Sequence, residues 1–229
     1  ENYQIIMPGG DLENSVVSSL EESGLQFERL EGFRLRVDGL PIDLITDRPG
    51  SVPERVTDPD AEKVIAGITG SDILWQNDLR GEGLVLPIES GSRMYIGATP
   101  QLVEESAQDS GREPLVTDLR STRVDTKFPK IAADVLEERG VTDADIRYAP
   151  GKVEAQYLMY PRSRGLVEIW SSGKSAKVNN ITVVEFIQEL NPVTVNLIEG
   201  SSLSADKRRV IGQFGAALLD GASSIRARQ

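Results

Sequence analysis

Short runs of apolar residues rich in Ile and Val alternate with amphipathic stretches along most of this chain. The runs have the length and composition of strands, and the amphipathic stretches place apolar residues at helical spacing. Alternation of these two kinds of element is typical of a parallel or mixed sheet covered by helices. The pattern therefore predicts an α/β fold.

The first part of the chain shows this alternation of strands and helices. A strand over Tyr3–Met7 leads into a Pro8-Gly9-Gly10 turn and a helix over about Leu12–Ser23, which Gly24 ends. A later helix begins at the Gly70-Ser71-Asp72 step, with Ser71 or Asp72 expected as its N-cap. The other elements expected here are strands at Arg34–Val37, Ile42–Thr46, Val64–Thr69, Gly83–Pro87 and Met94–Ala98 and a short helix at Val52–Val56.

The second part of the chain repeats the alternation after a polar segment. Gln108–Glu113 is polar, contains Gly111 and is followed by Pro114, which indicates a crossover between domains. Beyond it we expect strands at Ser121–Asp125, Asp145–Tyr148, Leu166–Trp170, Ile181–Phe186 and Val193–Ile198, and helices at Phe128–Arg139, from Val153, and at Ala205–Leu219. Two lobes are therefore expected, one formed by residues 1–98 and 182–229 and the other by residues 99–181.

Composition excludes several kinds of chemistry. The 229-residue chain contains no Cys and no His, so it has no disulfide scaffold, thiolate nucleophile, imidazole base or Cys/His zinc site. A metal would have to bind to oxygen ligands, which favours Mg²⁺. With a formal net charge of −11, the chain is not expected to bind a nucleic-acid polymer, although a local cluster of Arg and Lys can hold a small anion. No apolar run is long enough to span a membrane, and the expected location is the cytoplasm.

The segment from Gly165 to Lys177 contains the sharpest local signal. It places Glu168 near the end of a strand, and a small polar turn, Ser171–Ser175, follows. Backbone N–H groups of such a turn can surround a phosphate, and Lys174 adds positive charge. The turn is not a nucleotide P-loop, because that motif requires Gly at position 168. From the local sequence alone, an ordinary strand–turn–helix connection with capping Ser residues remains the alternative.

Five segments lie in an order and spacing that are more specific than any one of them. They are Arg48-Pro49-x-x-Val52-Pro53, Ala66–Leu74 (Ala-Gly-Ile-Thr-Gly-Ser-Asp-Ile-Leu), Arg123–Pro129 (Arg-Val-Asp-Thr-Lys-Phe-Pro), Gly151–Glu154 (Gly-Lys-Val-Glu), and Glu168 with Ser171–Ser175. Together they resemble the motifs of the ATP phosphoribosyltransferase family of histidine biosynthesis. The chain ends soon after the last expected helix, so we expect the short form of that family.

The resemblance implies two α/β lobes with a cleft between them, similar to periplasmic binding proteins, and a pentosyltransferase activity. In such a reaction an acceptor nitrogen attacks the anomeric carbon of 5-phosphoribosyl 1-pyrophosphate while Mg²⁺-bound pyrophosphate leaves. The catalytic residues would be Glu154, Glu168 and Lys127. The donor would bind Ser171, Ser172, Gly173, Lys174 and Ser175, and the cleft or acceptor residues would be Gly9, Gly10, Asp11, Arg48, Thr69, Gly70, Asp72, Arg93 and Arg164.

Three departures from the family's motifs alter charge. The family has a Lys-Gly-Arg-Leu turn after its first strand, whereas this chain has Gly9-Gly10-Asp11-Leu12, so two cations give way to one anion. Arg164 stands where the family has an acid, and the preceding stretch Tyr157–Arg162 is slightly longer. Asp125 replaces a small residue next to Thr126-Lys127, which adds a negative charge near the expected donor site.

These departures favour an acceptor other than ATP, cationic or neutral, in a specialised pathway. The alternative is a non-catalytic paralogue that binds a small ligand or regulates a partner, since closure of two lobes on a ligand needs no chemistry. Because a recognisable donor loop is retained, the sequence favours the transferase. The resemblance also implies a homo-oligomer or a complex with a separate regulatory subunit.

Overall fold

The computed structural model describes residues 2–32, 34–201 and 203–228, and the side chain of Asp11 also lies outside the described part. The chain divides into two compact units, Glu1–Ser90 with Thr194–Gln229, and Gly91–Val193. The second unit is thus inserted between two segments of the first. No helix within the described ranges is both long and apolar enough to cross a membrane.

The first unit is built on a seven-stranded sheet with the order β2-β3-β4-β1-β5-β12-β6. In chain order its strands are β1 (Tyr3–Pro8), β2 (Phe27–Arg29), β3 (Arg34–Val37), β4 (Ile42–Asp47), β5 (Val64–Gly70), β6 (Leu84–Glu89) and β12 (Thr194–Glu199). Strand β1 runs parallel to both β4 and β5, whereas β12 runs antiparallel to β5 and β6. The helices are α1 (Asp11–Glu22), α2 (Val52–Thr57), α3 (Ser71–Gln76) and α8 (Ala205–Arg226), and a 3-10 turn spans Pro49–Ser51.

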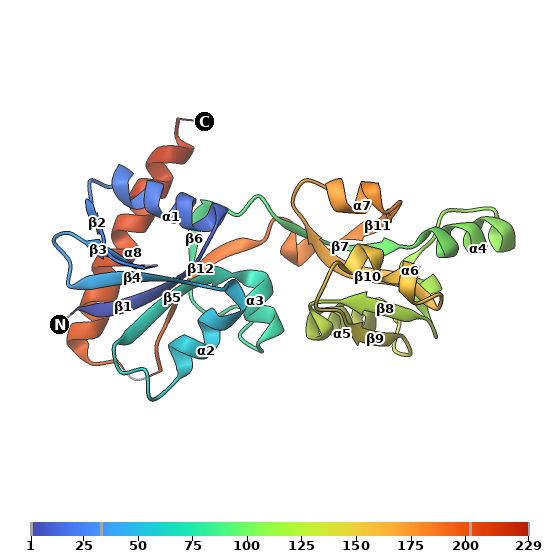
Figure 1. Cartoon of the computed structure of the whole chain (residues 1–229), viewed down its shortest axis with the longest axis horizontal. Helices are drawn as coiled ribbons and strands as arrows, with labels where there is room; N and C mark the ends of the chain where they lie inside the picture. Colours follow the sequence, from blue (N-terminus) through green and yellow to red (C-terminus); the bar gives the residue numbers. More distant parts are fainter. Residues whose placement is uncertain (1, 33, 202, 229) are drawn as a thin grey trace. The chain divides into compact units, whose positions relative to one another are not determined.

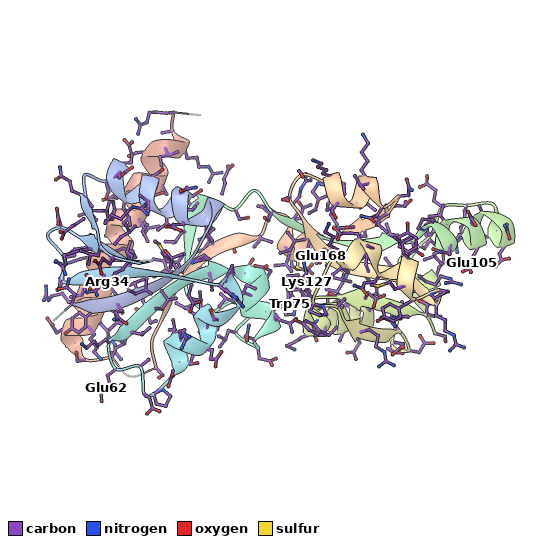
Figure 2. The ribbon with its side chains drawn as sticks, viewed as in Figure 1. Arg34, Glu62, Trp75, Glu105, Lys127 and Glu168 are labelled. Carbon is purple, nitrogen blue, oxygen red and sulfur yellow. The ribbon has the colours of Figure 1, made fainter. Side chains whose placement is uncertain are left out.

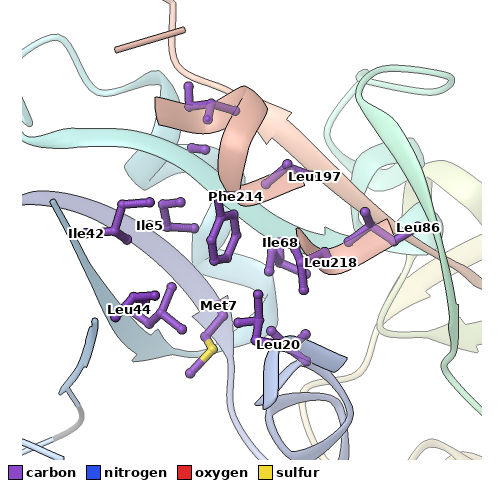
Figure 3. Close-up of a cluster of buried hydrophobic side chains, with 14 of the residues drawn as sticks. Ile5, Met7, Leu20, Ile42, Leu44, Ile68, Leu86, Leu197, Phe214 and Leu218 are labelled. Atoms are coloured by element: carbon purple, nitrogen blue, oxygen red, sulfur yellow. The ribbon is translucent and has the colours of Figure 1, made fainter. Parts of the chain in front are cut away.

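Both faces of this sheet are covered, because successive strand residues point to opposite sides. Ile5 and Met7 of β1 point to the face packed by α1 and α8, where Phe214 is fully buried (Figure 3). Ile6 points to the other face and packs with residues of α2 and α3, including Val52. A sheet buried on both sides explains why the parallel strands read as nearly continuous apolar runs.

The second unit contains a five-stranded sheet with the order β11-β7-β10-β8-β9 (Figure 1). Its strands are β7 (Arg93–Ala98), β8 (Arg123–Thr126), β9 (Asp145–Tyr148), β10 (Ser163–Trp170) and β11 (Thr182–Phe186). Its helices are α4 (Pro100–Ser110), α5 (Pro129–Glu138), α6 (Gln156–Met159) and α7 (Lys174–Val178), with 3-10 turns at Val116–Leu119, Val153–Ala155 and Gln188–Leu190. Strand β10 is central: it runs parallel to β8 and antiparallel to β7.

The predicted α/β class is confirmed, but the domain boundaries fall elsewhere. The units meet at Ser90/Gly91 and Val193/Thr194, not at residues 98 and 182. Strands β7 and β11 pair with each other in the second sheet, so both belong to the second unit. The predicted crossover at Gln108–Glu113 is wrong, since the segment lies within the second unit, where α4 occupies its first half and Gly111 is the left-handed C-cap of that helix at φ 63°.

Several local predictions also differ from the structure. The N-cap of α3 is Gly70, and the Ser71 hydroxyl instead accepts a hydrogen bond from the Thr194 amide at 3.0 Å. The helix expected from Val153 is a 3-10 turn followed by the four-residue α6. The last helix continues to Arg226, and the short strand β2 had no sequence signal. Apart from the longer last helix, these differences concern short elements, whose periodicity is weak.

Close packing of α1 on α8 requires glycine at position 221. A Cβ atom placed on Gly221 would lie 1.6 Å from the carbonyl oxygen of Ser19, whereas one on Gly212 in the same helix would meet nothing within 4 Å. We expect Gly221→Ala to lower the free energy of unfolding by about 1–3 kcal/mol, because the helices must separate. Gly212→Ala, the matched control, should leave it unchanged or raise it by up to about 1 kcal/mol. Urea unfolding followed by circular dichroism measures both, and equal effects would contradict the close approach.

Candidate functional site

The carboxyl end of β10 holds a buried acid between neighbouring strands. Glu168 is 5% exposed and lies directly opposite Tyr95 of β7 in the antiparallel register, so the two side chains share a face of the sheet. Lys127 follows the parallel strand β8, and its Nζ lies 3.4 Å from Oε2 of Glu168 (Figure 2). Glu154, 8% exposed, comes from the 3-10 turn Val153–Ala155 that packs against β10.

Glu168 is only partly compensated in this position. Its Oε1 accepts a hydrogen bond from the Ile169 amide at 2.8 Å, while its Oε2 meets Lys127 only at the long ion-pair distance. Burial raises the pKa of Glu168, the Ile169 amide and Lys127 oppose the rise, and the charge of Glu154 adds to it. A carboxylate in this state is well suited to accept a hydroxyl hydrogen bond or to face a developing cation.

Tyr95 is part of this site, although the sequence did not indicate it. The side chain is 1% exposed, and its hydroxyl has no hydrogen-bond partner among the described residues. Its ring packs edge-on against Trp170 at 5.5 Å between centroids and against Phe186 at 6.4 Å. Burial, reinforced by the charges of Glu154 and Glu168, raises the pKa of Tyr95, so it stays a protonated donor. Because a tyrosine within an apolar strand has the sequence pattern of a core residue, no pattern marks Tyr95 as a site residue.

The loop Ser171–Ser175 follows β10 on the same side of the unit. Gly173 has φ 70°, and a Cβ there would lie 2.1 Å from the Trp170 ring, so only glycine fits. The Ser171, Ser172, Lys174 and Ser175 side chains are exposed. Because α7 is five residues long, its macrodipole is small, and the first amides of the helix, which have no intrahelical partner, are the main donors.

Arg93 completes the group of predicted residues that the second unit brings together. It begins β7, directly opposite Trp170, and its guanidinium stacks on the Phe186 ring at 4.8 Å. Arg93 therefore lies at the same end of β10 as the loop. Glu154, Glu168, Lys127, Arg93 and Ser171–Ser175 thus gather at one end of the second sheet.

The first unit gathers a second group of predicted residues at one edge of its sheet. Strands β1, β4 and β5 are parallel, so Gly9 and Gly10 after β1, Arg48 after β4 and Gly70 at the end of β5 lie at the same edge. The Asp72 side chain is 5% exposed, and burial raises its pKa. In open α/β sheets ligands commonly bind at such an edge.

Thr69 and Asp11 are the two further residues of this group. Thr69, the penultimate residue of β5, is fully buried, and its hydroxyl has no hydrogen-bond partner among the described residues. Asp11 begins α1, but its side chain lies outside the described part of the chain. The edge is therefore defined by backbone and by Arg48, Thr69 and Asp72.

Arg164 is not brought together with the donor loop. It lies near the start of β10, at the opposite end of the strand from Glu168, and its Nη2 pairs with Glu105 of α4 at 2.7 Å. Figure 2 shows Glu105 and Glu168 at opposite ends of the second unit. Asp125 shares a face with Lys127, one pleat earlier, and its Oδ1 accepts a hydrogen bond from Arg123 Nη2 at 2.7 Å.

Solved structures of similar fold place the chain in a recognised class. It superposes on the ATP phosphoribosyl transferase (HisG:HisZ) complex from Thermotoga maritima with a TM-score of 0.69 and 22% identity, covering 97% of this chain and 99% of that one. It superposes on the periplasmic aliphatic sulphonate binding protein SsuA from Escherichia coli with a TM-score of 0.56 and 13% identity, covering 100% and 75%. The expected two-lobe class, similar to periplasmic binding proteins, is confirmed.

Sequence comparison identifies the family. The model of the HisG family, ATP phosphoribosyltransferase, matches residues 48–218, and the chain belongs to this family of pentosyltransferases. The ATP phosphoribosyltransferases of Maricaulis maris and Rubrobacter xylanophilus are 26% and 28% identical to it over 202 and 197 residues. Those matches cover 86% and 85% of this chain. The chain spans 65% of the length of the Maricaulis protein and 85% of the Rubrobacter protein.

The raised pKa of Glu168 makes the stability of the ligand-free protein depend on pH. A carboxyl whose pKa rises on folding binds its proton more tightly when folded, so its contribution to stability is lost as pH rises from the ordinary Glu pKa through the raised one. Glu168→Gln should therefore gain stability relative to wild type as pH rises, by on the order of 1 kcal/mol between about pH 4 and 8. Urea unfolding across this range measures the difference. The exposed Glu104→Gln is the control, and a difference for Glu168→Gln that is constant with pH would contradict the assignment.

Proposed function

We propose that this protein transfers the 5-phosphoribosyl group from phosphoribosyl pyrophosphate to a nitrogen acceptor and releases pyrophosphate. The observation that carries the proposal is the buried, partly compensated Glu168 beside Lys127, at the entry to the glycine-constrained loop. Family membership supports the same reaction class.

The residues at the end of β10 suit the two parts of the donor. Loop amides and the hydroxyls of Ser171, Ser172 and Ser175 supply donors for the 5-phosphate. Glu154 and Glu168 supply acceptors for the ribose hydroxyls. As the bond from the anomeric carbon to pyrophosphate breaks and the bond to the acceptor nitrogen forms, positive charge develops on the sugar, which nearby carboxylates stabilise.

Cations are available for the leaving group. Lys127 and Arg93 lie at this end of the unit and suit the pyrophosphate, and the proton released by the acceptor nitrogen passes to solvent. No three Asp or Glu side chains in the described residues form a ready-made cage for a metal ion. Mg²⁺ would therefore arrive as the counter-ion of pyrophosphate, with one or two carboxylates such as Glu168 within reach of it.

We further propose that the acceptor is not ATP. Gly9 and Gly10 occupy the sheet edge of the first unit, where the family's turn carries cations, and Arg48 is the one positive side chain among the predicted residues described there. Asp72 adds an acid to the same edge. A polyphosphate there would meet too little positive charge, whereas a neutral or cationic acceptor would not. A regulatory partner is also proposed, since the Thermotoga maritima neighbour is a two-protein complex.

Donor binding tests the role of Glu168. We expect wild type to bind phosphoribosyl pyrophosphate with Mg²⁺ in a calorimetric titration, and Glu168→Ala to lose at least about 100-fold in affinity, since a buried polar partner is removed. The exposed Glu104→Ala is the matched control in the same unit. Wild-type affinity in Glu168→Ala would end its role, and no donor binding by wild type would favour a non-catalytic, ligand-binding paralogue.

Pyrophosphate release tests the acceptor. With the donor and Mg²⁺, we expect little release with ATP and faster release with one of a panel of neutral and cationic heterocyclic or amine acceptors. Restoring the family's cations by Gly9→Lys with Asp11→Arg should raise release with ATP by about tenfold or more, because charge-assisted contacts to phosphate return. Rapid turnover of ATP by the wild type would overturn the proposed change of acceptor.

A further inference from the structure

A polar depression lies in the second unit, at the far end of β10 from the donor loop. It has a volume of about 870 Å³ and is lined by β8, β9, the start of β10 and the segment before it. The eight residues Ser163–Trp170 separate its floor from the loop Ser171–Ser175. At about 3.3 Å per residue that is more than 20 Å, so a small ligand cannot span both places.

Two of the three departures from the family's motifs lie at this depression. Arg164 and the end of the longer segment, Tyr160 to Arg162, line it directly. Asp125 lies beneath it and fixes Arg123, which also lines it, through hydrogen bonds of 2.9 and 2.7 Å from Nε and Nη2 to Oδ1. The depression therefore gathers Arg123 and Arg164 from two neighbouring strands and Arg162 from the segment before β10.

The lining has more hydrogen-bond donors than its own acids can use. Four arginines, at positions 123, 147, 162 and 164, face two lining carboxylates, Glu105 and Asp145, and the buried Asp125 that holds Arg123. Arg164 Nη2 forms an ion pair with Oε1 of Glu105 at 2.7 Å, and Arg147 Nε forms one with Oδ1 of Asp145 at 2.8 Å. Arg162 forms no ion pair among the described residues. Each guanidinium carries five N–H groups, so several remain for an anion even though the whole chain is acidic.

The depression also offers a flat platform. The Arg123 guanidinium stacks on the Tyr160 ring at 3.7 Å, and Tyr160 is 43% exposed. Asp125, 1% exposed, holds Arg123 in that orientation. A planar group of a ligand can lie against this pair, while its anionic group reaches Arg162 and Arg147.

We propose that this depression binds a small anion that carries an aromatic or heteroaromatic ring, at a site separate from the donor loop. The ring packs on Tyr160 and Arg123, and the phosphate or carboxylate pairs with Arg162 and Arg147. The inference does not depend on the proposed transferase function, since no residue of the donor site takes part in it.

Calorimetric titration with three probes tests the site. Phenyl phosphate combines both features, whereas inorganic phosphate and phenol each supply one of them. We expect phenyl phosphate to bind more tightly than either, with affinity that falls as salt rises. Arg162→Ala should weaken phenyl phosphate by about tenfold or more, since a charged hydrogen-bond partner is lost. Tyr160→Ala should weaken phenyl phosphate but not inorganic phosphate.

Two controls separate this site from others. Arg208→Ala removes an exposed arginine of the first unit and should leave binding of phenyl phosphate unchanged. Ser172→Ala alters the donor loop and should leave the affinity of phenyl phosphate for the depression unchanged, while any effect of that variant on phosphoribosyl pyrophosphate bears only on the transferase. Equal affinity of wild type and Arg162→Ala for phenyl phosphate, or no binding by wild type, would overturn the proposal.

Discussion

The rest of the second unit has to hold the carboxylate of Glu168 in a buried position with little compensation of its charge. A carboxylate that is 5% exposed and meets its cation only at 3.4 Å raises the free energy of the folded state. The strand ladders on both sides of β10 and the packing of Trp170 on Gly173 hold the acid there nevertheless. A ligand that supplies hydroxyl groups or a metal ion would provide the partner that Oε2 of Glu168 lacks. The cost of this incompletely paired carboxylate in the ligand-free protein therefore favours binding.

Strand β10 connects two chemically different regions. Because its pleat alternates, Glu168 and Trp170 share a face with Tyr95 and Arg93 at one end, while Arg164 and its partner Glu105 lie at the other. The parallel neighbour β8 has charged residues at the corresponding places: Lys127 follows its carboxyl end, and Arg123 begins it. This strand pair therefore carries charged groups of both regions, with Glu168 at one end and Arg123 and Arg164 at the other.

The sequence predicted most of the fold because strands such as Tyr3–Pro8 and Val64–Gly70 are buried on both faces and read as apolar runs. It misplaced the boundary between units because β7 continues directly from the first unit, and hydrogen bonding to β10, which lies some 70 residues later, decides where it belongs. The helix α4 was missed since its residues are mostly exposed and polar. For the site, motif order indicated Glu154, Lys127 and Glu168. Tyr95 and the ion pairs of Arg123 and Arg164 depend on register, which a linear pattern does not contain.

The distribution of charge shows why motif changes have to be interpreted in space. At the sheet edge of the first unit, the two cations of the family's turn are replaced in the sequence by Gly9 and Asp11, so this edge is less suited to polyphosphate. Along the sequence, the resemblance placed Arg164 among the cleft or acceptor residues, at a position where the family has an acid. In the structure it pairs with Glu105 at the opposite end of β10 from Glu168, so it does not reach the donor loop. The effect of each change of charge therefore depends on its own neighbours, which are Glu105 for Arg164 in the second unit and the parallel strand ends of the first unit for Gly9.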